Sequence, residues 1–277
     1  MFDIIVCPYC HQSLKNLYCD LCDIQYPLEN HIYYLYDTRK EHWAKCQKEL
    51  EALKVLDPGH DNDSSCSDPE YPYKQFFLDI DIGARANAGM LNVAKELIGL
   101  DNVQLGLDVG CHHGWCSMQL SKHCQMVGMD ISGHTFYGLG AVPSMNKGIT
   151  KVVADGCYMP FADNSFDFVI MVSSWHHLHD RLRGLNECYR VLKNTGKMLL
   201  LGECPMAEEN IAAIMQDGIR EYEGLPYTHK DLQIMFDKCK FENIELLPFK
   251  YLDNMAELGY KELIGLPNQN AIIYGVK

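Results

Sequence analysis

The sequence predicts an α/β fold in which a mostly parallel sheet carries helices on both faces, preceded by a small cysteine-rich module. From Val103 onward, short apolar runs alternate with helically spaced segments, as in successive strand–helix–strand units. The run Leu105–Val109 leads straight into a turn of small residues and a helix. A chain of 277 residues with 47% hydrophobic content can build one such domain and a small attachment.

Each element of the domain has its own local pattern. Apolar runs predict strands near 104–109, 126–131, 149–154, 166–173 and 196–203. Helical spacing predicts helices near 115–123, 133–140 and 180–193. The insert Pro205–Tyr227 is predicted to be mostly helical, and Thr228 with Asp231 resembles a capping box at the start of the next helix. Phe241–Phe249 and Ala271–Val276 are predicted to be the last strands.

Residues 1–36 form the cysteine-rich module. Cys7-Pro-Tyr-Cys10 and Cys19-Asp-Leu-Cys22 are two CxxC pairs separated by eight residues. One CxxC turn directs two thiolates at one point, and two such turns complete a tetrahedral zinc site. The segment is too short to bury a core, so zinc would supply the missing folding free energy. The alternatives are four structural cysteines or a redox pair.

Residues 37–72 connect this module to the domain at 73–277. Thr38–Leu56 has helical spacing, which predicts a packing or bridging helix. Asp57–Pro72 carries three prolines and five acids without Lys or Arg, which is typical of a linker. Tyr73–Leu100 is predicted to be largely helical.

The turn after the first strand of the domain has the features of a nucleotide-binding corner. It reads LGLDVGCHHG from Leu105 to Gly114. Glycine lets the backbone approach a ligand, and the helix start offers free N–H donors. Asp130 follows Gly110 by twenty positions and ends the second apolar run, which is the place of a carboxylate that binds a ribose diol.

Four ordered motifs extend this pattern and carry a resemblance to a known family. They are LDVGC-x-x-G, MD, ADG-x-x-MPFADNSFDFV and ECYRVLKNTGKMLLLGE. Together they resemble class I S-adenosylmethionine (SAM) methyltransferases, of the type 11, ubiquinone/menaquinone-methyltransferase-like group, from Ala84 to Leu247. The resemblance implies a Rossmann-like sheet whose last two strands form an antiparallel hairpin at one edge, with SAM as cofactor. The module, with DIQYPLENHIYYL after its second CxxC, resembles the small zinc ribbon that accompanies or activates several methyltransferases.

The resemblance also implies the residues that bind the cofactor. They are Asp108, Gly110, His112, Gly114, Asp130, Asp155 and Gly156. Asp130 matches the acid that binds the ribose, and Asp155 matches the acid that accepts a hydrogen bond from the adenine amino group. His112 stands where most members have the middle glycine, and its imidazole either contacts the cofactor or substrate or points away from the ligand.

The segment SSWHHLHD holds three histidines within four positions at the end of the fourth strand. Ligands of open α/β sheets bind at this edge, and histidine can remove a proton near neutral pH. His176 and His177 are therefore the candidate catalytic residues, with at most one of them acting as base, ahead of His179. Tyr227 and His229 are alternative substrate contacts.

Composition limits the compartment. No stretch approaches the roughly 18–20 apolar residues of a membrane span, and the N-terminus lacks the pattern of a signal peptide. The 13 cysteines form an odd set, and many lie in apolar runs. These features predict a reduced, cytoplasmic protein.

The charge of the chain bears on which class of acceptor it can bind. The formal net charge of −13 opposes nucleic-acid binding, and residues 1–36 contain four acids against Lys15 alone. The leading hypothesis is a methyltransferase that acts on a small molecule. The alternatives are an rRNA or tRNA methyltransferase with an N-terminal zinc finger, and a non-catalytic SAM-fold protein. The zinc ribbon is expected to pack on its own catalytic domain or on a partner protein.

Overall fold

The computed structural model describes residues 2–56, 68, 70–75, 79, 82–135, 138–141, 148–203, 227–247 and 271–277. The strands are β1 (Tyr18–Cys19), β2 (Ile24–Gln25), β3 (Leu28–Glu29), β4 (Ile32–Tyr34), β5 (Leu105–Val109), β6 (Gln125–Asp130), β7 (Ile149–Val153), β8 (Phe166–Val172), β9 (Leu192–Glu203), β10 (Glu242–Leu247) and β11 (Ala271–Val276). The helices are η1 (Phe2–Ile4), α1 (Glu41–Leu56), α3 (Ile82–Ile98), η3 (Leu100–Asn102), α4 (Trp115–Leu120), η5 (Trp175–His177), α5 (Arg181–Val191) and α7 (His229–Lys238).

The large sheet has nine described strands in the order β10-β11-β9-β8-β5-β6-β7-β4-β3. The strands from β9 through β8, β5 and β6 to β7 are parallel, and β5 lies at the centre, paired with β6 on one side and β8 on the other. At one edge β11 pairs antiparallel with both β9 and β10. The predicted α/β class and the antiparallel hairpin are therefore confirmed.

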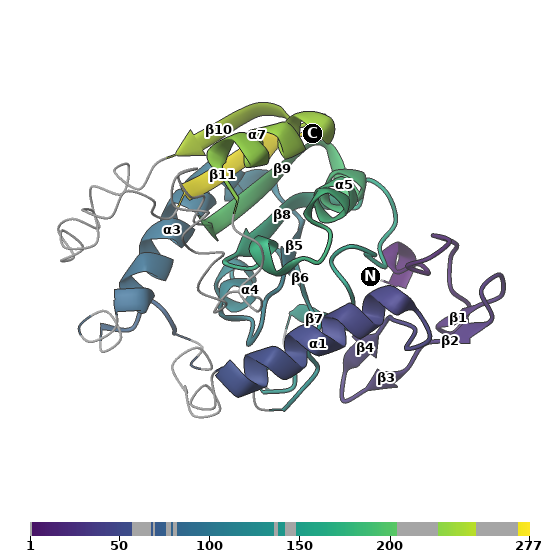
Figure 1. The fold of residues 1–277 in the computed structure, drawn as a ribbon. Helices are drawn as coiled ribbons and strands as arrows, with labels where there is room; N and C mark the ends of the chain where they lie inside the picture. Colours follow the sequence, from purple (N-terminus) through teal and green to yellow (C-terminus); the bar gives the residue numbers. More distant parts are fainter. Residues whose placement is uncertain are drawn as a thin grey trace.

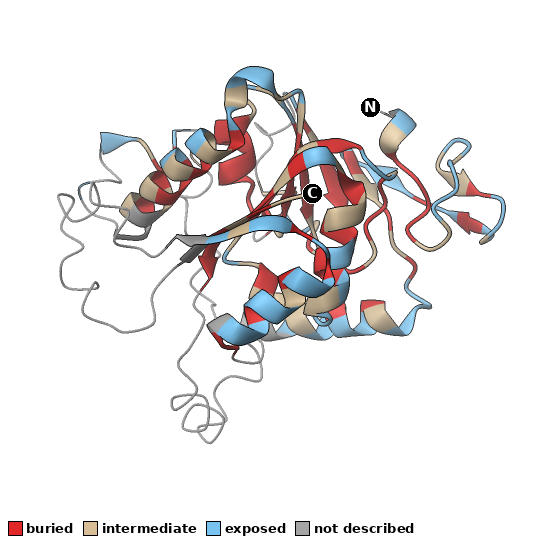
Figure 2. Cartoon of the chain, turned by 90° about the horizontal axis from the view of Figure 1, so that it is seen from above, coloured by how far each residue is buried: buried red, intermediate tan, exposed pale blue. Residues whose placement is uncertain are grey.

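Alternation along the central strands explains why helices cover both faces (Figures 1 and 2). Successive side chains of a strand point to opposite faces. On β8, Phe168 and Ile170 are buried in the cluster that contains α3 and α4, whereas Val169 and Met171 are buried in the cluster that contains α5 and α7. Each face of the sheet thus has its own hydrophobic core.

The N-terminal module packs on the domain of its own chain. β4 pairs in parallel with β7, and β3 follows it, so residues of the module extend the sheet at the edge opposite β10. The Val6 amide donates to the Pro160 carbonyl at 2.9 Å, and Ile5 forms a bridge with Phe161. Tyr26, 1% exposed, belongs to the same hydrophobic cluster as Phe161.

The helix predicted near 133–140 is not present in the described part of that segment. Residues 132–134 have no regular secondary structure and residues 138–141 form a turn, and the Leu139 amide donates to the Ser132 carbonyl at 3.0 Å. Glycine explains the difference, since a Cβ at Gly138 would lie 2.5 Å from the Ser132 carbonyl oxygen, so the turn requires a residue without a side chain. Near the C-terminus, the predicted capping box is confirmed at the start of α7: the Asp231 amide donates to Thr228 Oγ1 at 3.0 Å, and the Thr228 amide donates to Asp231 Oδ2 at 2.9 Å. The predicted insert before Tyr227 lies outside the described residues.

Candidate active site

The corner between β5 and α4 is built from residues in left-handed backbone conformations. Gly110 has a φ of 71°, His112 of 50° and Gly114 of 77°, and Gly114 is the residue at which α4 begins. A Cβ at Gly110 would lie 2.5 Å from the Cβ of Ser174, so no side chain fits there. His112 adopts the conformation that glycine would adopt more easily, and its backbone amide points at an acid.

That acid is Asp130, at the end of β6. Its Oδ2 accepts the His112 amide at 2.8 Å, and its Oδ1 accepts the Ser132 amide at 2.8 Å. Burial raises the pKa of Asp130, although these two amides oppose the shift. Each carboxylate oxygen has a second lone pair, so the group can still accept from a diol.

Asp108, near the end of β5, is 1% exposed. Its Oδ2 accepts a hydrogen bond from the Ser117 hydroxyl at 2.7 Å, whereas its Oδ1 is buried with no hydrogen-bond partner among the residues the structure describes. Burial raises the pKa of Asp108 to about 7. A buried acceptor beside the corner is thus available to a donor that a bound cofactor would bring.

The raised pKa of Asp108 predicts a pH-dependent effect of Asp108→Asn on the ligand-free protein. The native carboxyl, with a pKa of about 7, binds a proton more tightly than the unfolded one at 3.8, so stability falls as pH rises through this window. Asparagine removes the buried charge. The variant should melt above wild type at pH 8, and the difference should shrink toward pH 4. A melting difference that is the same at every pH would contradict this assignment.

Asp155 follows β7 and receives three hydrogen bonds. His42 Nδ1 lies 2.7 Å and His179 Nε2 2.8 Å from its Oδ2, and the Cys157 amide donates to its Oδ1 at 2.8 Å. Burial alone would raise the pKa of Asp155, but the two imidazoles hold it well below its usual range. The Ala154 amide donates to the Asp130 carbonyl at 3.0 Å, so the two acids follow paired neighbouring strands.

The loop at residues 173–180, which holds His176, His177 and His179, lies directly on the corner at Gly110. The Ser174 hydroxyl donates to the Val109 carbonyl at 2.8 Å. His176 Nδ1 lies 3.0 Å from Glu203 Oε2, and Glu203 is fully buried at the end of β9. The same carboxylate accepts the Trp175 amide at 3.1 Å and the Tyr227 hydroxyl at 2.7 Å. Its position is therefore fixed from three sides.

His177 has a different carboxylate partner. Its Nδ1 lies 2.7 Å from Oε1 of Glu49, which comes from α1. His42, Cys46 and Glu49 are four and three positions apart on α1, so they share one face of the helix. Helix α1 thus contacts both the Asp155 end and the histidine end of the site, and Figure 1 shows it passing in front of the sheet. Its sequence predicted a helix but gave no sign of these contacts.

The four N-terminal cysteines converge in a separate cluster. Their Sγ atoms all lie within 4.8 Å of one another, with Cys7 and Cys22 at 3.7 Å and Cys10 and Cys19 at 3.5 Å. A Zn–S bond of about 2.3 Å makes the S···S edge of a tetrahedron about 3.8 Å, so the donor set fits a zinc ion. The Cys22 amide also lies 3.4 Å from Cys19 Sγ, which orients that thiolate.

The comparisons with known proteins agree with this geometry. Residues 107–200 match the family model of a methyltransferase domain. The chain is 28% identical over 196 residues to a demethylmenaquinone methyltransferase of Staphylococcus aureus, a match that covers 61% of this chain and 80% of that protein. It is 29% identical over 129 residues to the mitochondrial arginine-hydroxylase NDUFAF5 of Rattus norvegicus, a match that covers 45% of this chain and only 34% of that relative's length.

The solved structure of the [4+2]-cyclase SpnF has a TM-score of 0.58 to this chain at 17% identity, covering 84% of this chain and 96% of that one. This similarity establishes the fold. Together with the match to the methyltransferase-domain model over residues 107–200 and the strand order, it gives the chain the fold of class I SAM-dependent methyltransferases. NDUFAF5 and SpnF are named for reactions other than methyl transfer, so the fold alone does not define the reaction of this chain.

Among the described residues, no helix is long and apolar enough to cross a membrane.

Proposed function

We propose that the chain transfers a methyl group from SAM to a small-molecule acceptor. The observation that supports this most strongly is the corner at Gly110, where a strained backbone, two amide-oriented carboxylate oxygens on Asp130 and an unsatisfied oxygen on Asp108 lie together. A dinucleotide or nucleoside with donor groups fits such a corner. Bound SAM would supply an electrophilic methyl group on a sulfonium.

The residues of this chain would hold SAM at three points. Asp130 would accept hydrogen bonds from the ribose diol. Asp155 would accept one from the adenine amine through Oδ1, which the Cys157 amide leaves with a second lone pair. The unsatisfied Oδ1 of Asp108 would accept a donor at the same corner. The helix start at Gly114 adds the partial positive charge of its free amides.

His176 is the candidate that the geometry favours as the base that deprotonates the acceptor. The buried Glu203 carboxylate at Nδ1 favours the tautomer in which that nitrogen carries the proton, which leaves Nε2 free to accept one. The partner of His177 lies on α1 and is 20% exposed, so it fixes that ring less firmly. His176 side-chain exposure of 24% leaves room for an acceptor to approach.

Charge supports a small acceptor over RNA. The net charge of −13 opposes binding to a polyanion. The name of the S. aureus relative, a demethylmenaquinone methyltransferase, also belongs to a small-molecule reaction. The test is incubation of the full chain with methyl-labelled SAM and, in separate arms, a metabolite extract and total RNA. Label in a small molecule supports the proposal, and label in RNA at moderate salt overturns it.

We also propose that the cysteine cluster, formed by Cys7, Cys10, Cys19 and Cys22, is a structural zinc site. A four-thiolate set without an open position is the kind that stabilises a fold and does no chemistry. The unpaired cysteines buried elsewhere in the described chain, among them Cys116 and Cys188, fit a reducing compartment such as the cytoplasm.

The role of Asp130 predicts a loss of cofactor affinity on substitution. Asp130→Ala should weaken binding of S-adenosylhomocysteine by roughly 1–3 kcal/mol, the cost of leaving a buried diol unpaired. Titration calorimetry on the full chain measures it, with Asp101→Ala, a change of an exposed acid, as the matched control. Unchanged affinity in a folded Asp130→Ala variant would remove this residue from the site.

A further inference from the structure

A second cluster of metal-ligating side chains lies where α1 meets the domain. His42 Nδ1 and His179 Nε2 both approach one carboxylate oxygen, Oδ2 of Asp155, at 2.7 and 2.8 Å. The three ligand atoms lie within 4.8 Å of one another. The residues come from three separate segments: the start of α1, the loop after β7 and the loop before α5. Nothing in the binding of SAM requires two imidazoles at this point.

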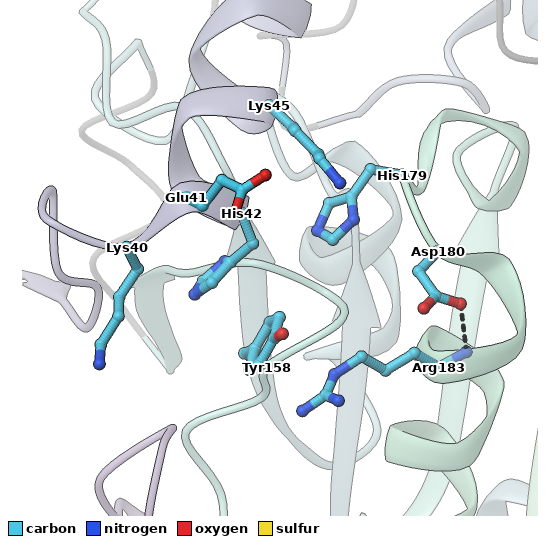
Figure 3. Close-up of a pocket in the computed structure, with 8 residues that line it drawn as sticks. All are labelled: Lys40, Glu41, His42, Lys45, Tyr158, His179, Asp180 and Arg183. Carbon is cyan, nitrogen blue, oxygen red and sulfur yellow. Dashed lines mark hydrogen bonds between the residues drawn. The ribbon is translucent and has the colours of Figure 1, made fainter.

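The two histidines also line a cavity of about 430 Å³. Figure 3 shows the Lys45 side chain extending from α1 toward His179 and the Arg183 side chain extending from the start of α5 toward Tyr158, and Lys40 also lines the cavity. Glu41 and Asp180 line it too, and the side chain of Asp180 accepts the Arg183 amide at 2.9 Å. The cavity therefore offers space and positive charge next to the imidazoles, which suits water or a small anion.

Packing holds His42 in place. Its ring stacks on Tyr158 with centroids 3.8 Å apart and planes at 20°, and the Arg183 guanidinium lies 3.8 Å from the centre of the same Tyr158 ring. Tyr9, which stands between Cys7 and Cys10, lies 5.7 Å from the His42 ring. A ring that is fixed from several sides loses little entropy when it becomes a ligand.

We propose that His42, Asp155 and His179 bind a second zinc ion, with its open coordination position facing this cavity. Two imidazoles and one carboxylate form the three-ligand set of zinc sites that keep a fourth position for water or a ligand. The ion takes the place of the protons between the three groups. Zinc bonds of about 2.1 Å put tetrahedral ligand atoms about 3.4 Å apart, so the rings withdraw by roughly 0.6 Å.

The proposed ion and the cofactor use different oxygens of Asp155. The ion takes Oδ2, to which both imidazoles now point, whereas the adenine amine would use Oδ1 beside the Cys157 amide. The zinc site therefore shares Asp155 with the proposed cofactor site but uses a different oxygen, and its test requires neither SAM nor an acceptor.

The test is equilibrium dialysis of the full chain against micromolar zinc, followed by metal analysis. Wild type should hold about two zinc ions per chain, one on the four cysteines and one on the three-ligand set, whereas His42→Ala and His179→Ala should hold about one. His123→Ala, which removes an exposed histidine after α4, is the matched control and should keep both ions.

Cobalt provides a second readout on the same proteins. A chain whose cysteine site is filled with zinc should take up cobalt and show visible absorption without thiolate charge transfer, and the His179→Ala variant should lose that signal. Two results would overturn the proposal. In the first, wild type holds only the cysteine-bound zinc at saturation. In the second, a second ion persists in both histidine variants. The first result would leave the two histidines as hydrogen-bond donors to Asp155.

Discussion

Serine at both Cys7 and Cys22 should remove the N-terminal zinc and lower the stability of the whole chain. Structural zinc contributes an apparent binding free energy of about 10–16 kcal/mol in small modules, and folding of the module depends on it. The loss of stability should extend to the methyltransferase-like domain, because Ile5 and Tyr26 of the module lie in the core of that domain and β4 pairs with β7. Metal analysis and thermal unfolding of the purified variant measure the two effects.

Cys124→Ser is the control for this double variant, since Cys124 is half-buried and lies far from the cluster along the chain. It should keep about one zinc ion per chain on the four thiolates. Full zinc occupancy after both substitutions at Cys7 and Cys22, or no zinc in wild type, would end the assignment of a structural zinc site.

His176→Ala should lose methyl transfer while it keeps SAM affinity. A base in the transition state contributes on the order of 10²–10⁴-fold in rate, and this residue would act on the acceptor. The acceptor for this assay is the one that the labelled-methyl screen identifies. Glu203→Gln should lower the turnover rate less, since it weakens the orientation of the His176 ring and leaves the imidazole in place. It should also shift the pH profile of that rate.

His177→Ala is the comparison that distinguishes the two histidines. Because its partner Glu49 lies on α1, it should change the rate less than His176→Ala. A larger loss of turnover rate in His177→Ala than in His176→Ala would make His177, and not His176, the candidate base. Wild-type turnover in the double variant would show that no base is needed, so that alignment alone lowers the barrier, by an amount that reaches about 7–11 kcal/mol in well-oriented reactions.

Much of the domain followed from the sequence because its signals are local. The run Leu105–Val109 and its successors are buried parallel strands, which read as continuous apolar segments. Thr228 and Asp231 form their capping box within three positions. The described part of segment 133–140 does not form the predicted helix, because the turn at 138–141 brings Gly138 and Gly140 too close to neighbouring backbone for a side chain.

The part of the site that the sequence did not reveal depends on contacts across more than a hundred positions. His42 lies against Asp155 and Glu49 against His177, and no local pattern connects residues so far apart along the chain. The spacing of His42, Cys46 and Glu49 marked a helical face, but such a face is usually part of a core. The contacts of this face depend on how α1 packs at the ends of β7 and β8, where Asp155 and His177 lie.

The central claim, that this chain binds SAM at the Gly110 corner, is tested most directly by calorimetric titration of the 277-residue chain with S-adenosylhomocysteine. We expect saturable binding of about one ligand per chain, at the corner after β5 in the middle of the described sheet. We also expect affinity to fall in Asp130→Ala and to persist in His176→Ala. The absence of binding to well-folded wild-type protein would contradict the account.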